Sequence, residues 1–380
     1  MSAELILDNA LVVLGDRVIH GHIVVRAGII AAIDEGPSGA RGALDLDGDH
    51  LTPGLVELHT DNVERHLVPR PGVVWPTLPG VLAHDAAIAS AGITTVLDAI
   101  ACGSDHGKEW RREICTTAVA GIDAARGAGH LRCEHLLHLR CELVARDMPE
   151  SFQRNIDNPH VRLVSIMDHT PGARQFVDME RFRIYYKGKH GLGDAELEAM
   201  IGERQAMQAE LAPGHRQQVV KACRERGITL ASHDDATAEH VREAVELGVT
   251  IAEFPTTVEA AEAARRHGLA TVMGAPNIVR GESHSGNVAA GELAQHGLLD
   301  ALSSDYVPSS LMQAAWLLHE DGGMELPAAF RVVATNPARL LGLSDRGEIA
   351  PGLQADLVRV RRTDEGPVVR EVWRRGRRIA

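Results

Sequence analysis

The middle of the chain repeats one pattern, in which a short apolar segment is followed by a stretch with helical periodicity. Each apolar segment has the length and composition of a buried strand. Strands that alternate with helices form a parallel sheet, and eight of them can close into a ring. The pattern therefore predicts an α/β fold built around a TIM-type (β/α)8 barrel. The expected strands cover residues 55–58, 94–98, 135–142, 163–169, 228–233, 249–254, 270–274 and 302–305.

Helices are expected between these strands, and two neighbouring stretches, 194–210 and 214–226, are predicted as separate helices. The longest stretch without a clear pattern is 170–193, and a loop of that length is typical of a lid or a binding loop. All the expected helices cover residues 80–91, 108–128, 194–210, 214–226, 236–247, 257–267, 287–296, 309–321 and 327–340.

Both ends of the chain differ from the middle. Residues 4–50 and 347–378 predict short strands separated by turn residues, without helices between them. Neither end is large enough to bury a core alone. We therefore expect one small β-sandwich domain built from residues 1–52 plus 344–380, and a barrel domain over residues 53–343.

Composition excludes several classes of partner. The net charge of the 380 residues is -13, which disfavours non-specific binding to nucleic acid or to an anionic membrane. The chain has five cysteines and no CxxC pair, and it lacks a secretory signal, so we expect a cytoplasmic protein. An anionic small molecule is compatible with the charge where local cations overcome it. The expected assembly is a homo-oligomer, such as a dimer.

A possible metal pair ends the first barrel strand. Residues 51–62 read LTPGLVELHTDN, so the strand is followed by His59, Thr60 and Asp61. Side chains two residues apart in a strand point to the same side, so His59 and Asp61 face one way. Imidazole and carboxylate are good ligands for a divalent metal. An exposed polar strand end explains this pair alone equally well.

Further polar residues end other predicted strands, namely Glu142, His169, His233 and Asp305. In a barrel all such ends open on one face, where active sites lie. Each residue has a simpler explanation: Glu142 could be a solvated strand end, and His169 could cap a loop. Asp234 and Asp235 compete with His233 for a ligand role. The joint pattern predicts two divalent ions held by His59, Asp61, Glu142, His169, His233 and Asp305.

This arrangement resembles the amidohydrolase superfamily. The segment Thr52–His59 is similar to the first-strand motif of that superfamily, and residues 347–358 are similar to its C-terminal sheet motif. Asn336–Arg339 is similar to the helix that leads into the sheet. The resemblance covers almost the whole chain, and it implies a metal-dependent hydrolase in a barrel.

Two departures from the superfamily pattern concern the metal ligands. The usual first-strand pair is two histidines, where this chain has His59 and Asp61. The usual bridging group is a carboxylated lysine, and no lysine lies at a strand end here. Glu142 is therefore expected to bridge the metals. The resemblance implies that Asp305 orients the attacking water and takes its proton.

A narrower resemblance is to the phosphonate-metabolism branch, the family of alpha-D-ribose 1-methylphosphonate 5-triphosphate diphosphatases of the carbon–phosphorus lyase pathway. It implies hydrolysis of a ribose 5-triphosphate to the 5-phosphate with release of diphosphate. The ligand set admits zinc, manganese, iron or magnesium. The motifs that carry this resemblance lie in residues 59–73, 83–85, 167–172, 232–235, 252–255, 274–287 and 302–310.

A polyphosphate substrate needs cations and backbone donors. Segment 274–287 is rich in glycine and serine, and the long stretch 170–193 holds two of the four lysines. A surface ion pair of Arg280, or an ordinary helix cap at 283–287, would explain the same residues. A helix N-terminus is also an anion site, which favours phosphate binding. The predicted substrate contacts are Arg174, Lys187, Lys189, Arg280, Ser283, His284, Ser285 and Asn287.

Two other functions are alternatives to hydrolysis of a ribose triphosphate. An amidohydrolase that acts on a C–N bond, such as a cyclic amide hydrolase or a deaminase, would use the same metal ligands but would not need the anion-binding residues. A non-catalytic barrel scaffold would have lost ligands, and every expected position carries one.

Overall fold

The structure is a computed structural model that describes residues 4–103, 109–174, 179, 183, 193–283 and 286–380. Four of the predicted substrate contacts, Lys187, Lys189, His284 and Ser285, lie outside the described residues. Most of the predicted lid, residues 170–193, lies outside them as well.

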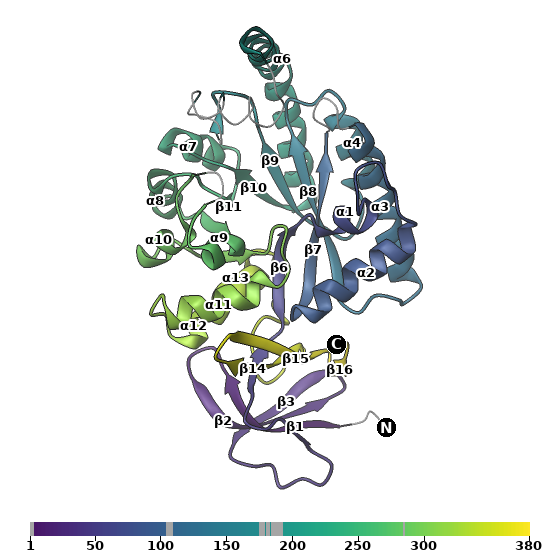
Figure 1. Ribbon diagram of the computed structural model, residues 1–380, viewed down its shortest axis with the longest axis vertical. Coiled ribbons are helices and arrows are strands. Elements are labelled where there is room, and N and C mark those ends of the chain that lie inside the picture. The colour runs from purple at the N-terminus through teal and green to yellow at the C-terminus, as the bar shows by residue number, and fades with distance from the viewer. Residues whose placement is uncertain (1–3, 104–108, 175–178, 180–182, 184–192, 284–285) are drawn as a thin grey trace.

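Eight parallel strands form the barrel and are hydrogen-bonded in sequence order from β6 to β13 (Figure 1). A parallel bridge between Thr60 and Asp305 brings the two edge strands together. The expected (β/α)8 barrel is confirmed. Its strands are β6 (Leu55–Thr60), β7 (Ile93–Cys102), β8 (Glu134–Glu142), β9 (Val161–Met167), β10 (Thr229–His233), β11 (Ile251–Glu253), β12 (Ala270–Gly274) and β13 (Ala301–Ser303).

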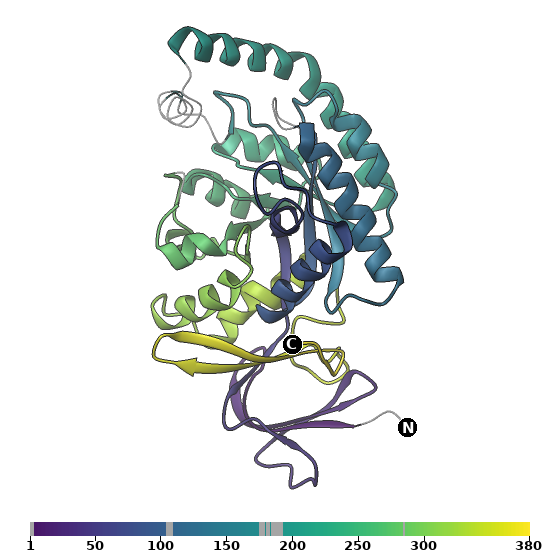
Figure 2. The same cartoon turned by 45° about the vertical axis from the view of Figure 1, so that its right-hand side comes forward.

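Helices cover the outside of the barrel (Figure 1). The prediction of two helices over 194–226 is wrong, because one helix, α6, runs through Pro213. A proline inside a helix removes one backbone hydrogen bond and bends the axis, and α6 changes direction along its length in Figure 2. The helices are α1 (Asn62–Leu67), α2 (Thr77–Ser90), α3 (Glu109–Gly127), α4 (Met148–Asn155), α6 (Asp194–Arg226), α7 (Ala238–Glu246), α8 (Val258–Arg266), α9 (Ala275–Arg280), α10 (Ala290–Gln295), α11 (Ser310–Glu320), α12 (Leu326–Phe330), the π-helix Arg331–Thr335 and α13 (Asn336–Leu340).

The barrel interior is filled by one buried side chain from each strand. Leu58, Leu97 and Leu136 belong to this layer, and the sequence neighbours of Leu97 on β7 and of Leu136 on β8 therefore point outward. The layer is completed by Leu163, Ala231, Ile251, Val272 and Ala301. A barrel packed in this way is solid below its rim, and ligands bind at the strand ends.

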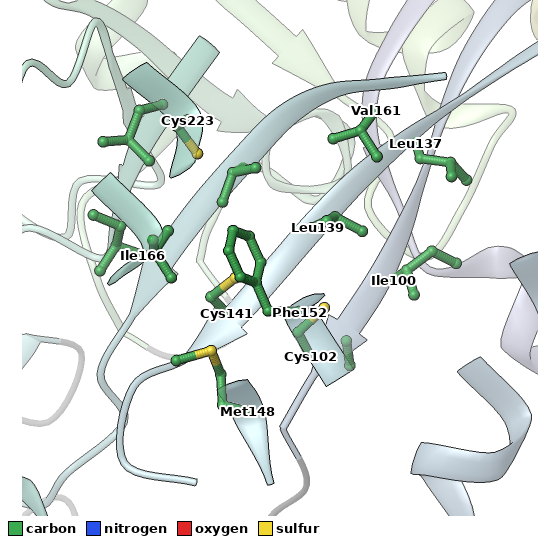
Figure 3. Packing of buried hydrophobic residues seen from close by; sticks show 14 of the residues in the cluster. Ile100, Cys102, Leu137, Leu139, Cys141, Met148, Phe152, Val161, Ile166 and Cys223 are labelled. Carbon is green, nitrogen blue, oxygen red and sulfur yellow. The ribbon is translucent and has the colours of Figure 1, made fainter. Parts of the chain in front are cut away.

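A second apolar layer lies between the strands and the outer helices. Figure 3 shows Cys102, Cys141, Met148 and Phe152 packed together in it. Burial raises the pKa of the Cys141 thiol well above its usual value. Cys141 is therefore a packing residue, as its alternation with Glu142 predicts.

Strands from both ends of the chain form a separate mixed sheet (Figure 1). The sheet has its own core, which includes Ile23, Leu51 and Trp373. Its strand β5 is separated from barrel strand β6 only by Gly54. A Cβ atom at Gly54 would lie 2.3 Å from Oγ1 of Thr94, so no larger residue fits there. The strands are β1 (Leu5–Val13), β2 (Val18–Arg26), β3 (Ile29–Glu35), β4 (Leu44–Asp45), β5 (His50–Pro53), β14 (Leu357–Thr363), β15 (Gly366–Arg374) and β16 (Arg377–Arg378).

Among the described residues, no helix combines the length and the apolar character needed to cross a membrane.

Candidate active site

A cavity of about 210 Å3 opens where the barrel strands end. Its walls come from residues within β6, β8, β10 and β12 and from residues that follow β9, β10, β11, β12 and β13. Seven of the predicted site residues line it: His59, His169, His233, Arg280, Ser283, Asn287 and Asp305. Residues far apart in the sequence are therefore brought to one face of the barrel, as expected for residues at the carboxyl ends of its strands.

The three cavity histidines are each fixed by a glutamate. Nδ1 of His59 and Nδ1 of His233 each lie 2.7 Å from Glu253, on separate carboxylate oxygens. Nδ1 of His169 lies 2.5 Å from Glu142. A histidine that donates Nδ1–H to a carboxylate presents Nε2 as its free electron pair, in the orientation that the carboxylate imposes. This is the arrangement in which imidazole binds a metal.

Asp234 completes a group of donors that face one another. Its Oδ2 atom lies 3.7 Å from Nε2 of His169 and 3.6 Å from Nε2 of His233. This oxygen is buried and has no hydrogen-bond partner among the residues that the structure describes. A buried carboxylate oxygen without a partner is costly, and a cation that binds all three atoms would remove that cost. The residues present therefore fit a divalent metal ion. Together we call His59, Glu142, His169, His233, Asp234 and Glu253 the cavity cluster.

The electrostatics of the cavity cluster favour a positive charge. Burial opposes charge on His169, but the Glu142 and Asp234 carboxylates outweigh it and raise the pKa of His169 to about 10. Burial would raise the pKa of Glu253, yet His59 and His138 hold it well below its usual range. The group therefore holds a proton tightly when no other cation is bound. A divalent ion would compete with that proton for the same atoms.

The backbone of Asp305 is locked to the end of β6. Its N–H donates to the carbonyl of His59 at 3.0 Å, and its carbonyl accepts from Oγ1 of Thr60 at 2.8 Å. The residue has φ of 54°, in the left-handed region, so the chain turns sharply after β13. These contacts hold Asp305 at the cavity wall beside His59.

The comparisons with known proteins identify the family. The profile of the amidohydrolase family matches residues 51–379. The chain belongs to the amidohydrolase family. It is 47% identical over 377 residues to the alpha-D-ribose 1-methylphosphonate 5-triphosphate diphosphatase of Escherichia coli strain K12, with 99% of this chain and 100% of that protein covered.

This amidohydrolase is also similar, more distantly, to an allantoinase and to a deacetylase. It is 25% identical over 432 residues to an allantoinase of Salmonella paratyphi B, covering 94% of this chain and 86% of that protein. The solved structure of N-acetyl-D-glucosamine-6-phosphate deacetylase from Mycobacterium smegmatis superposes with a TM-score of 0.66 over all of both chains. The identity to that structure is 16%, so it supports the fold alone.

Three predicted residues of the amidohydrolase do not line the cavity. Glu142 lies behind His169, so its position favours an orienting role over the bridging role expected from the sequence. The Asp61 carboxylate lies 3.8 Å from the Arg140 guanidinium. Arg174 is buried and ion-paired with Asp235 and with Glu243, so the expected contact of Arg174 with phosphate is not supported.

Sequence reasoning missed two members of the cavity cluster as site residues. Glu253 is the last residue of β11, so its position at a strand end predicts a place near the cavity. Its carboxylate lies beneath two histidines, however, and not at the cavity surface. Asp234 was considered only as a competitor of His233. It has φ of 55°, a turn that aims its side chain back toward the cavity and that alternation in a strand does not predict.

Glu57 is a further buried carboxyl that supports the site. It accepts hydrogen bonds from the backbone N–H groups of His59 and Ser304, both at 2.7 Å, and so joins the ends of β6 and β13. Burial raises the pKa of Glu57 to about 8, against the lowering effect of these hydrogen bonds. The carboxyl therefore holds two cavity strands at a fixed distance.

Proposed function

We propose that this amidohydrolase hydrolyses alpha-D-ribose 1-methylphosphonate 5-triphosphate to the 5-phosphate and diphosphate, as a step of phosphonate catabolism. The observation that carries the proposal is the 47% identity to a diphosphatase of that name over the full length of both chains. The chain also has both parts that such a reaction needs. These are a set of metal donors and, on the same cavity, side chains that can bind an anion.

Two divalent ions are part of the proposal. His169, His233 and Asp234 would hold one of them, and His59 and Asp305 would hold the other. Zinc, manganese, iron and magnesium all bind mixed sets of imidazole and carboxylate. When bound, such ions lower the pKa of water and offset the negative charge of phosphate oxygens.

The chain's own residues have separate tasks in this mechanism. Asp305 accepts the proton of the attacking water, since the residue lines the cavity and its backbone is fixed to the end of β6. Glu142 and Glu253 keep the histidine rings in one tautomer and one orientation. Arg280, Ser283 and Asn287 bind the phosphate chain at the rim. Lys187, Lys189, His284 and Ser285 stay predictions from the sequence.

A cytoplasmic location belongs to the same proposal. All five cysteines are buried free thiols. Unpaired thiols are typical of proteins in reducing compartments.

The test is release of diphosphate from ribose 5-triphosphates, measured beside a panel of cyclic amides. The protein is stripped of metal with a chelator and reloaded with one metal at a time. We expect diphosphate release that depends on metal, and no hydrolysis of the amides. Hydrolysis of a cyclic amide without release of diphosphate would overturn the proposal and support action on a C–N bond.

A further inference from the structure

Arg140 is an inward-facing residue of β8 that the sequence analysis did not select. Its neighbours Leu139 and Cys141 pack in the outer apolar layer, so alternation turns Arg140 toward the barrel interior. It lines the cavity together with His59 and Asp305. A long cationic side chain therefore reaches the cavity wall from inside the barrel.

Among the described residues, the guanidinium of Arg140 has no partner within hydrogen-bond distance. Its side chain is 15% exposed, and its nearest carboxylate oxygen, on Asp61, is 3.8 Å away, beyond hydrogen-bond distance. Its Nε atom is buried and has no hydrogen-bond partner in the part of the chain that the structure describes.

The buried arginines Arg346 and Arg359 are paired much more closely than the partly buried Arg140. Arg346 lies 2.9 Å from Glu134, and Arg359 lies 2.6 Å from Asp49. Buried arginine normally has such partners, because an unpaired buried cation is costly. The described residues therefore leave N–H donors of the Arg140 guanidinium available for a ligand, and this guanidinium lies at the cavity where the substrate binds.

We propose that Arg140 is a specificity-determining residue that binds a phosphate group deep in the cavity, while Arg280 binds a second phosphate at its mouth. Arg280 lines the same cavity but is 46% exposed and lies 3.6 Å from Glu282. Two guanidinium groups at different depths match a chain of phosphates and would serve no purpose for a neutral ring. The proposal rests on the proposed function, since it assigns a residue to that substrate.

The chemistry of arginine suits this task. A guanidinium is planar and permanently charged, and it can donate two parallel N–H bonds to the oxygens of one phosphate. Asp61 is close enough to attract the guanidinium but too far to occupy its donors. The weak pair keeps Arg140 oriented and leaves its hydrogen bonds for the ligand.

The test measures binding of inorganic diphosphate to the metal-loaded protein by calorimetry, with metal content determined for each variant. We expect Arg140→Ala to weaken binding by about 10- to 100-fold with metal content unchanged, since a hydrogen bond to a charged group is lost. Arg140→Lys keeps the charge but not the paired donors, and should restore part of the loss. Arg280→Ala should have a smaller effect, because its guanidinium is more exposed.

Arg266→Ala is the matched control, since Arg266 is an exposed residue of α8 paired with Glu262 outside the cavity. It should bind diphosphate like the unaltered protein. Arg140→Gln has a similar length without charge and serves if Arg140→Ala does not fold. Diphosphate binding within twofold of the unaltered protein in a folded, metal-loaded Arg140→Ala or Arg140→Gln variant would overturn the assignment, whatever the activity.

Failure of the proposed function gives a different result from failure of the assignment. If the unaltered protein binds diphosphate through Arg140 but releases none from ribose triphosphates, the reaction is wrong and the phosphate contact stands. If the unaltered protein releases diphosphate and the Arg140 variants match it in binding and in KM, the reaction stands and the contact is wrong.

Discussion

Two groups of histidines and carboxylates in the described part of the chain differ in the partners of their ring nitrogens. The cavity cluster lies at the mouth of the barrel. The other group, His84, Asp85, Asp98 and His135, lies between the barrel wall and α2, and we call it the sealed cluster. In both groups three ligand atoms come within 4.8 Å of one another, so residue type and distance alone do not separate them.

The partners of each ring nitrogen do separate them. In the sealed cluster Asp98 lies 2.7 Å from His84 and 2.7 Å from His135. The second nitrogen of His135 lies 3.2 Å from Asp85, and that of His84 lies 3.0 Å from the amide of Asn62. Every ring nitrogen is therefore used. In the cavity cluster the Nε2 atoms of His169 and His233 face a carboxylate oxygen that lacks a hydrogen bond. A metal site is therefore indicated by nitrogen and oxygen atoms that face one another beside a cavity without being used in hydrogen bonds, and not by the residue types alone.

The largest expected effect on bound metal and on activity is that of removing a cavity histidine. We expect His233→Ala to lose bound metal and to lower the rate of diphosphate release by more than about a thousandfold, because one ligand of the ion is gone. The fold should be kept, since the cavity is partly open and Glu253 retains His59 as a partner. Metal analysis and the rate assay check this, with exposed His267→Ala as the control. Full metal content in His233→Ala would exclude His233 from the ligands.

The sealed cluster should show the opposite behaviour. Asp98 is buried between two histidines, and Asp98→Asn leaves His84 without a carboxylate partner and His135 with Asp85 alone. We expect the free energy of unfolding to fall by about 3–5 kcal/mol, as for other broken buried ion pairs. Metal content per folded protein should not change. Denaturant unfolding and metal analysis of the same sample check both parts. A loss of metal without a loss of stability would make the sealed cluster a metal site.

Four of the cavity residues could be predicted from the sequence, and the sealed cluster could not, for a physical reason. A barrel brings all strand ends to one face, so position along a strand located His59, His169, His233 and Asp305 without knowledge of distances. Leu97 and Leu136 point into the barrel, so Asp98 and His135 point outward. Their contact with His84 then depends on how α2 packs on the barrel, which the pattern of one chain does not show.

The same limit explains the errors within the site. Position along β8 brought Glu142 to the correct end of the barrel, but a side chain there can face the cavity or stand behind a histidine. Arg174 follows β9 and was expected to meet a phosphate. The acidic residues that pair with it come from α7 and from the turn after β10, and only the packing of those elements reveals them.

The smallest expected effect is the pH dependence of stability that His135 of the sealed cluster contributes. Burial disfavours charge on His135, but Asp98 and Asp85 overcome it and raise the pKa of His135 to about 9. An unfolded histidine has its pKa near 6.5. Between these values the folded chain holds a proton that the unfolded chain has lost. The stabilisation is therefore complete below about pH 6.5 and disappears as the pH rises through about 9.

Unfolding free energies measured from pH 6.5 to 9.5 should fall by at most about 1.4 kcal/mol per pH unit from this one proton. The chain has other titrating groups, so the comparison is with His135→Gln, which cannot bind the proton. The variant should be less stable at pH 6.5, and its curve should approach that of the unaltered protein as the pH rises. Parallel curves would mean that His135 is neutral in the folded state. The sealed cluster would then be held by neutral hydrogen bonds, and its contrast with the cavity cluster would rest on geometry alone.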